Sequence, residues 1–343
     1  MIQIEHDGLI FRFPEVHDDA EMAIEFRRTL RVPVDGRLYK LPPSHRAFRL
    51  KDLDDCGERV PQDWIERGGV IMPLYKGEAM YMAFSGGGWV KGYPFAIKIA
   101  AGNINAISGK PWKDELDPTE QDYIVIPRQP RFYGFCNARN EIRQFVAMLL
   151  GSGYPVAEQL TGQAEPGGIQ IVAYPMKADH YERTIRNRYE ELMEWVNGWS
   201  LLAFSAPQPS GPYFRRPMSL AAGGRMKQPI YRDPYGIEAW EQSVERKTCR
   251  CFVTLADALQ WKEITGDQLP HPPPTAAEFA EVNLPWLDVY AEDAETLTGS
   301  PNLALAGDLV DVADKKGDER LGPDGEVKPD TVIRVGAVEP SRA

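Results

Sequence analysis

The chain has 343 residues, of which 43% are hydrophobic and 26% charged, and its formal net charge is −11. This composition is typical of a soluble globular protein, long enough for one big domain or two ordinary ones. The acidic balance argues against bulk nucleic-acid binding, which needs a dense basic surface. The N-terminal residues do not resemble a signal peptide, and no apolar run approaches the roughly 20 residues of a membrane span.

The cysteine content and spacing exclude two further classes of protein. Four cysteines are present, and they are too few for a disulfide scaffold and lack the paired spacing of a zinc ribbon. Cys249 and Cys251 lie two apart, so on a strand they would share a face, as joint metal ligands or as buried small side chains. We favour buried side chains, and expect a reduced, cytoplasmic protein without metal or cofactor.

The N-terminal half of the chain has the pattern of many short strands. Apolar and polar residues alternate over residues 22–32, and Asp35-Gly36 then supplies a hairpin turn. Further strands separated by Gly, Pro and Asp turns are expected at residues 70–75, 78–84, 94–100, 104–108, 122–127 and 167–174. The predicted fold class is mainly β (α+β): antiparallel hairpins in a β-sandwich or barrel-like arrangement.

The domain organisation follows from where this pattern changes. Residues 1–308 are expected to form a single large β-rich domain, or two packed subdomains split near residue 176. Residues 178–198 have the apolar spacing of an inserted amphipathic helix, and the Pro/Gly-rich residues 205–229 are predicted to form a loop. A strand and short helices follow, and the acidic tail, residues 309–343, is expected to be largely disordered.

The Gly-Ser-Gly sequence at residues 151–153 invites comparison with catalytic and phosphate-binding turns. A nucleophile elbow needs G-x-S-x-G between a strand and a helix, and Pro155 follows Ser152 too closely for a helix to begin at the serine. Neither the glycines of "GNINAISGK" nor those of "SGGGWVKG" have the spacing of a phosphate loop or a dinucleotide-binding turn. We therefore interpret Ser152 as part of a tight turn between two strands.

Two carboxylates stand beside aromatic residues, as in many carbohydrate-active sites. Asp288 lies in "LPWLDVY" and Asp233 in "YRDPYG". A glycoside hydrolase uses a pair of such acids, whose separation decides the reaction. Asp-Pro-Tyr-Gly is equally typical of a plain turn.

Basic residues gather near the predicted loop of this acidic chain. They are Arg215, Arg216, Arg225, Lys227 and Arg232. Such a local concentration could bind an anion, an acidic segment or a partner protein, although a solvated loop that happens to be basic has the same composition.

The order of several sequence blocks resembles a widespread family of bacterial and fungal proteins. The blocks include "RTLRVPVDGRLYKLPPS", "RQFVAMLLGSGYPVAEQLTG" and "GGRMKQPIYRDPYGIEAW", and the resemblance spans residues 24–295. The family brings no established activity, cofactor or catalytic residue. Its members tend to have proline at the position of Leu149, which implies strand–turn–strand for that block. They often have histidine in the strand where this chain has Val253-Thr254.

These observations favour a non-enzymatic binding or self-assembly module of structural type, acting on a protein partner or on further copies of the chain. Its contact surface could include Met72, Tyr75, Met80, Tyr81 and Met82, although a packed core would explain these residues equally well. The alternative function is a hydrolase acting on carbohydrate through Asp233 and Asp288.

Overall fold

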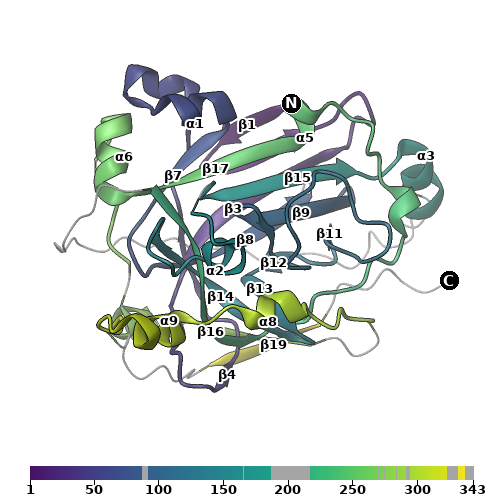
Figure 1. The fold of residues 1–343 in the computed structure, drawn as a ribbon. Helices are drawn as coiled ribbons and strands as arrows, with labels where there is room; N and C mark the ends of the chain where they lie inside the picture. Colours follow the sequence, from purple (N-terminus) through teal and green to yellow (C-terminus); the bar gives the residue numbers. More distant parts are fainter. Residues whose placement is uncertain are drawn as a thin grey trace.

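Nearly all the described strands belong to one large, mainly antiparallel β-sheet that is not closed into a barrel (Figure 1). The structure is a computed structural model. It describes residues 1–86, 92–164, 166–186, 217–268, 270–273, 275–282, 284–290, 294–322 and 331–336. The predicted β-rich fold class is confirmed.

The sheet contains two runs of neighbouring strands, which meet where β16 pairs with β17. The first run is β1 (Ile2–Glu5), β2 (Gly8–Arg12), β3 (Glu21–Thr29), β8 (Ala79–Gly86), β14 (Glu141–Leu149) and β16 (Pro217–Lys227). The second is β11 (Ile124–Ile126), β9 (Phe95–Ala101), β15 (Ile169–Pro175), β17 (Arg250–Asp257), β7 (Val70–Leu74) and β6 (Lys51–Asp52). Shorter strands lie beside these, namely β4 (Leu38–Tyr39), β5 (Ser44–Ala47), β10 (Ile104–Asn105), β12 (Arg131–Phe132) and β13 (Gly134–Ala138).

The sequence predicted the positions of the strands better than it predicted how they pair. The hairpin of β9 and β10 is confirmed, with Ile104 opposite Ala101. The chain also turns at Lys76-Gly77, but β7 pairs in parallel with β17, and β8 pairs with β3. All five residues of β7 are buried, so the strand lacks the alternation that would specify a local antiparallel partner. The hairpin expected at Asp35-Gly36 is also absent, because β4 pairs with β16.

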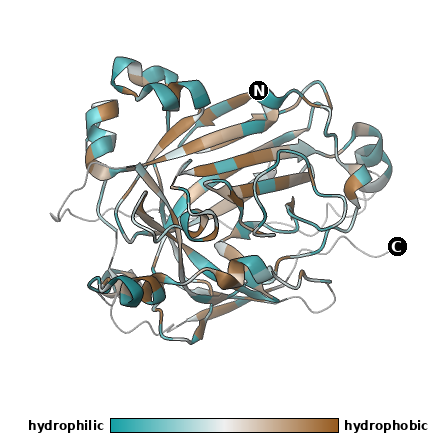
Figure 2. Ribbon diagram, in the orientation of Figure 1, coloured by the Kyte–Doolittle hydropathy of each residue, from teal (hydrophilic) through white to brown (hydrophobic). Residues whose placement is uncertain are grey.

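The hydrophobic core lies between the strands and the helices and loops that cover them. Figure 2 shows the hydrophobic residues mainly along the strands. Met72, Met80 and Met82 have no exposed surface, and Tyr81 is 2% exposed. These residues, considered above as a contact surface, therefore belong to the core. Tyr75 lies at its margin and donates a hydrogen bond to the carbonyl of Pro270.

The helices are short and lie around the sheet (Figure 1). Within the described residues they are α1 (Gln62–Arg67), α2 (Val156–Thr161), α3 (Ala178–Tyr181), α5 (Arg246–Cys249), α6 (Ala258–Thr265), α7 (Ala276–Val282), α8 (Pro301–Leu305) and α9 (Leu309–Lys316). The 3-10 turns are Asp54–Arg59 and Ile237–Ala239. The predicted helix before Gly266 is confirmed as α6, which begins with the side chain of Asp257 accepting two backbone N–H groups and ends at Gly266 in the left-handed conformation.

The inserted helix is described only at its start. There α3 leads into a π-helical turn, Glu182–Arg186, and residues 187–198 lie outside the described residues.

The loop predicted over residues 205–229 is corrected by the structure. Residues 205–216 are outside the described residues, but Pro217–Lys227 form β16, the longest strand described. The glycines that suggested a loop instead permit close packing. A Cβ at Gly224 would lie 2.4 Å from the carbonyl oxygen of Pro33, and one at Gly223 would lie 2.7 Å from Val146.

The prediction of a largely disordered tail over residues 309–343 is likewise wrong for its described parts. Leu309–Lys316 form α9, and Val332–Gly336 form β19, which pairs in parallel with β18 (Trp286–Tyr290). Leu309, Val312 and Ala313 are buried against β14 and β16, so an amphipathic pattern had been hidden by the acidic composition. Residues 323–330 and 337–343 are outside the described residues.

Candidate functional site

The Gly-Ser-Gly turn binds a carboxylate from its own chain. The backbone N–H groups of Gly151 and Gly153 donate hydrogen bonds to the two carboxylate oxygens of Glu158, at 2.7 and 2.6 Å. Both glycines have positive φ, which orients these N–H groups as an anion-binding turn. The hydroxyl of Ser152 donates to the carbonyl of Leu149. This turn therefore has a structural ligand, and no imidazole is bonded to Ser152 among the described contacts.

The secondary structure after this turn differs from the prediction. The turn follows β14 as expected, but α2 begins immediately after Pro155, so the block is strand–turn–helix. Proline fits the start of a helix because its missing N–H would have no partner in the first turn. The carboxylate of Glu158 lies in that first turn and binds back to the glycines, which stabilises the arrangement.

The predicted basic residues are dispersed among separate ion pairs. Arg215 and Arg216 lie outside the described residues. Arg225 and Lys227 are on β16, and Arg232 follows it. Arg225 is 2.5 Å from Glu141, Lys227 is 2.7 Å from Asp288, and Arg232 is 3.1 Å from Glu295. The described members therefore do not form one free cationic site.

Asp288 and Lys227, predicted for two different functions, lie together. The ammonium of Lys227 donates to Asp288, and the ammonium of Lys40 is 3.6 Å from its other oxygen. The hydrogen bond from Lys227 holds the pKa of Asp288 below its usual range. Only 15% of the Asp288 side chain is exposed, so this carboxylate is an ionised structural link between β16, β18 and the residues after β4.

Asp233 binds a different set of partners, and no contact joins it to Asp288 in the described part of the chain. One of its oxygens accepts from the Tyr123 hydroxyl and the Trp240 indole, both at 2.8 Å, and the other accepts from the N–H of Tyr235. The last bond is that of an Asx turn, as the Asp-Pro-Tyr-Gly sequence predicts. Burial, and then the neighbouring Asp233, raises the pKa of Tyr123.

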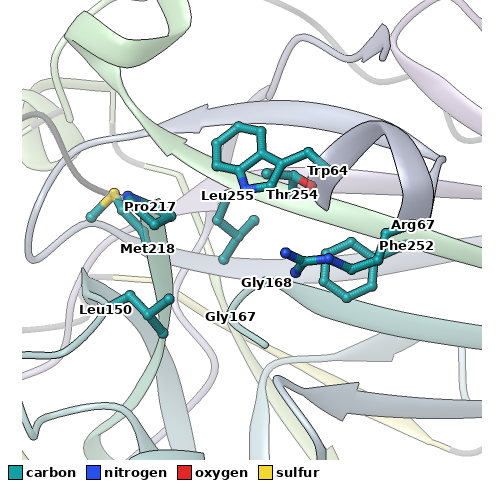
Figure 3. Close-up of a pocket in the computed structure, with 10 residues that line it drawn as sticks. All are labelled: Trp64, Arg67, Leu150, Gly167, Gly168, Pro217, Met218, Phe252, Thr254 and Leu255. Carbon is teal, nitrogen blue, oxygen red and sulfur yellow. The ribbon is translucent and has the colours of Figure 1, made fainter. Parts of the chain in front are cut away.

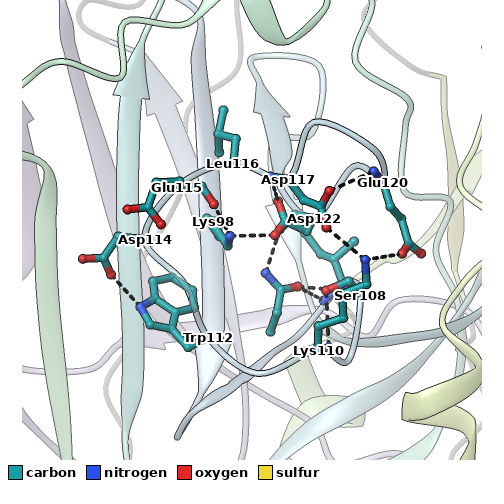
Figure 4. Close-up of polar contacts among 12 residues, drawn as sticks. Lys98, Ser108, Lys110, Trp112, Asp114, Glu115, Leu116, Asp117, Glu120 and Asp122 are labelled. Carbon is teal, nitrogen blue, oxygen red and sulfur yellow. Dashed lines mark hydrogen bonds and ion pairs between the residues drawn. The ribbon is translucent and has the colours of Figure 1, made fainter.

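A buried ion pair that was not expected from the sequence joins Lys98 of β9 to Asp122, which lies shortly before β11 (Figure 4). The Lys98 ammonium is 2.6 Å from Asp122, and the two side chains are only 3% and 6% exposed. Lys98 also donates to the carbonyl of Glu115 and lies 5.6 Å from the centre of the Trp112 ring. Burial raises the pKa of Asp122, and the hydrogen bond from Lys98 opposes that shift. A lysine inside an otherwise apolar strand is the signal that could have indicated such a pair.

The loop over Lys98 is held by further ion pairs (Figure 4). Lys110 lies 2.9 Å from Asp117 and 2.8 Å from Glu120. Asp114 accepts from the Trp112 indole and lies 2.6 Å from Arg246 on α5. Each of these groups binds within the loop or to an adjoining element. The network therefore fixes the loop on the sheet.

A second buried ion pair joins β3 to the start of β8. Arg28 lies 3.1 Å from Glu78, with side-chain exposures of 5% and 1%. Arg28 also donates to the carbonyls of His271 and Pro272 and lies 5.0 Å from the centre of the Phe48 ring. Burial outweighs the attraction of Arg28 and raises the pKa of Glu78 to about 7.

A small cavity lies where the two strand runs meet (Figure 3). Its volume is about 20 Å³, and it is lined by residues that include Trp64, Arg67, Gly168 and Thr254. The Thr254 hydroxyl has no hydrogen-bond partner in the described structure. A cavity of this size holds about one water molecule, so it has no room for a sugar or a nucleotide.

The four cysteines are buried free thiols. Burial raises the pKa of Cys249 to about 11 and that of Cys251 to about 12, which makes both thiols unreactive at neutral pH. Among the described residues, no group of three or more His, Cys, Asp or Glu side chains is arranged to hold a metal ion. Cys249 ends α5 and Cys251 lies on β17, so the two do not share one strand as predicted, and both side chains are buried.

In the part of the chain that the structure describes, no helix is long and apolar enough to cross a membrane.

A small sheet formed by β18 and β19 lies beside the large one. Leu41 and Leu287 exchange two backbone hydrogen bonds, which join β18 to the residues after β4. On its outer side β19 has no strand partner in the described ranges. This small sheet was not expected because "VIRVG" lies in a tail whose acidic composition suggested disorder. Its β-branched residues Val332, Ile333 and Val335 were the available signal.

Comparisons with models of protein families, with curated proteins and with solved structures found no match. The family resemblance of the sequence blocks therefore stays a prediction.

Proposed function

We propose that this chain is a non-enzymatic binding or self-assembly module of structural type in the cytoplasm, with a protein partner or further copies of itself. The observation that carries the proposal is the outer edge of β19, which has no strand partner among the described residues. The two acids that suggested catalysis are instead held by other side chains, Asp288 by Lys227 and Asp233 by Tyr123. Unpaired strand edges readily add a further strand from another chain.

The alternative, a carbohydrate hydrolase, requires two acids that flank a substrate. To act on a substrate, Asp288 would have to break its ion pairs with two lysines, and Asp233 would have to break its hydrogen bonds with Tyr123 and Trp240. Losing such partners is unfavourable for a partly buried carboxylate. The geometry therefore supports the binding module over the hydrolase.

The proposal is tested on the full-length protein in two measurements. Size-exclusion chromatography with light scattering should show particles larger than the 38.6 kDa chain at high protein concentration, or a stable complex with a partner. A panel of glycosides and polysaccharides should show no hydrolysis. The proposal fails if a glycan is hydrolysed and Asp288→Asn abolishes that activity while its circular dichroism spectrum matches that of the wild-type protein. Asp233→Asn is the second variant, since it tests the other acid.

A further inference from the structure

The backbone of β19 presents hydrogen-bonding groups away from its partner strand. The N–H of Trp286 donates to the carbonyl of Thr331 at 2.8 Å, and the two strands are parallel, with Trp286 opposite Val332. In a parallel pair, alternate residues direct both their N–H and C=O groups to the same neighbour. Thr331, Ile333 and Val335 therefore bond toward β18, and the backbone groups of Val332 and Arg334 point to the open side.

Among the described residues, the charged side chains that contact this small sheet are mostly positive. Lys40 and Lys227 share one carboxylate, that of Asp288. Arg334, in register with Asp288, is exposed and lies 4.8 Å from the centre of the Tyr290 ring, and no carboxylate forms an ion pair with it in the described structure. Three cations thus lie near one anion in a chain whose net charge is −11. This local excess favours an acidic ligand.

An exposed apolar side chain lies on the same strand. Ile333 on β19 is 36% exposed, and few large hydrophobic residues of the described chain are as exposed. Successive side chains of a strand point to opposite faces of the sheet. If the acidic residues of an added strand lie on the face of Arg334, the residues between them lie on the face of Ile333.

We propose that β19 binds an extended segment of a partner protein, in which acidic residues alternate with apolar ones, as an additional strand. The backbone of Val332 and Arg334 supplies the hydrogen bonds, Arg334 and the nearby lysines attract the acidic side chains, and Ile333 contacts an apolar one. This inference rests on the proposed function and names its docking surface and the chemistry of the partner. Because this segment is acidic and the β19 edge is basic, the proposed partner is not the β19 edge of a second copy.

The test uses the full-length protein and two fluorescein-labelled peptides, one of alternating Glu and Val residues and one of alternating Lys and Val. Fluorescence anisotropy should show binding of the acidic peptide, weakened by added salt, and much weaker binding of the basic one. Arg334→Pro removes the outward N–H and the charge together, and should raise the Kd for the acidic peptide at least about tenfold. Arg334→Ala keeps the N–H and should cause a smaller loss.

The matched control is Arg37→Ala, since Arg37 is also exposed but is not on β19. It should leave the Kd within about twofold of the wild-type value. If Arg334→Pro does not fold, Arg334→Glu retains the N–H and should bind the basic peptide better than the acidic one. Equal binding of both peptides, or an Arg334→Pro protein that binds like the wild type, overturns the inference.

Two outcomes separate this inference from the proposed function. If Arg334 variants bind the acidic peptide normally while the protein still self-associates or binds a partner, the docking surface is wrong and the module remains. If Arg334→Pro abolishes self-association but leaves peptide binding intact, the edge belongs to a second copy, and the partner segment is rejected.

Discussion

Glu78 and Lys98 are charged residues at buried positions of the sheet, and each lies against a partner of opposite charge. Removing one member of such a pair usually destabilises a protein strongly, because the other charge stays buried without compensation. The two pairs therefore specify which loops cover the sheet. Lys98 holds the loop that contains Asp122, and Arg28 holds the segment at His271.

The raised pKa of Glu78 gives a prediction for stability against pH. The pKa is about 7 in the folded protein and 4.5 without the fold, so the folded state binds more protons between these values. Stability from this group is therefore fully present below about pH 4.5 and is lost as the pH rises toward 7. Glu78→Gln removes the titration. We expect the wild-type free energy of unfolding to fall relative to that of Glu78→Gln by roughly 3 kcal/mol across this window.

Urea unfolding of both proteins at several pH values measures this difference. A constant offset between the two curves would contradict the prediction, because loss of the contact with Arg28 alone does not titrate in this range.

At the residue scale, the sequence could indicate chemical character but not partners. It drew attention to Asp288 through its aromatic neighbours and to Lys227 through local basicity, and assigned them different functions. Their ion pair forms because β16 and β18 lie near each other, although Lys227 and Asp288 are 61 positions apart in the sequence. No local pattern carries that information. The Asx turn at Asp233 was predictable because its bond to Tyr235 is local.

At the element scale, α9 shows how an acidic tail can contain a stable helix. Asp308 accepts hydrogen bonds from the N–H groups of Val310 and Asp311, and Asp311 accepts from the N–H of Asp308, which forms a capping box. Asp308 also lies 2.7 Å from Arg143 on β14. The acids that suggested disorder therefore begin the helix and attach it to the sheet.

Removal of this cap gives a prediction for α9. Asp308→Ala loses the capping bonds and the contact with Arg143, and should lower the free energy of unfolding by about 1 to 2 kcal/mol. Asp314→Ala is the matched control, since Asp314 lies on the same helix and pairs with Arg320 at the surface. It should leave the urea midpoint unchanged. Equal effects of the two substitutions would contradict a specific role for Asp308.

Elements with complete local signals were predictable, and elements defined by distant partners were not. The helix α6 has a capping aspartate and a terminal glycine, and the β9–β10 hairpin has a tight turn. By contrast, Gly223 and Gly224 in β16 look like loop residues until their contacts with Val146 and Pro33 are known. The edge strand β19 was not predictable either, because its partner is distant in the sequence: Val332 lies opposite Trp286, 46 positions earlier.

At the scale of the whole molecule, the two described strands of the large sheet that follow residue 176, β16 and β17, pair with each other and lie among strands from before residue 176. The nine residues of β14 extend from Glu141 opposite Lys227 to Leu149 opposite Met218, so β16 completes a strand from the first half. β17 lies between β15 and β7 and hydrogen-bonds to both. The part of the sheet after residue 176 is therefore paired along both of its strands with strands from before that residue.

The interleaved sheet predicts that the chain unfolds as one unit. Proteins of this length often unfold in several steps, domain by domain. Here we expect tryptophan fluorescence and far-UV circular dichroism to follow a single urea transition with the same midpoint, because loss of β16 or β17 removes partners from both strand runs. Fluorescence reports on Trp64 before residue 176 and on Trp240 and Trp261 after it, all of which are buried. Two separated transitions would instead support two packed subdomains split near residue 176.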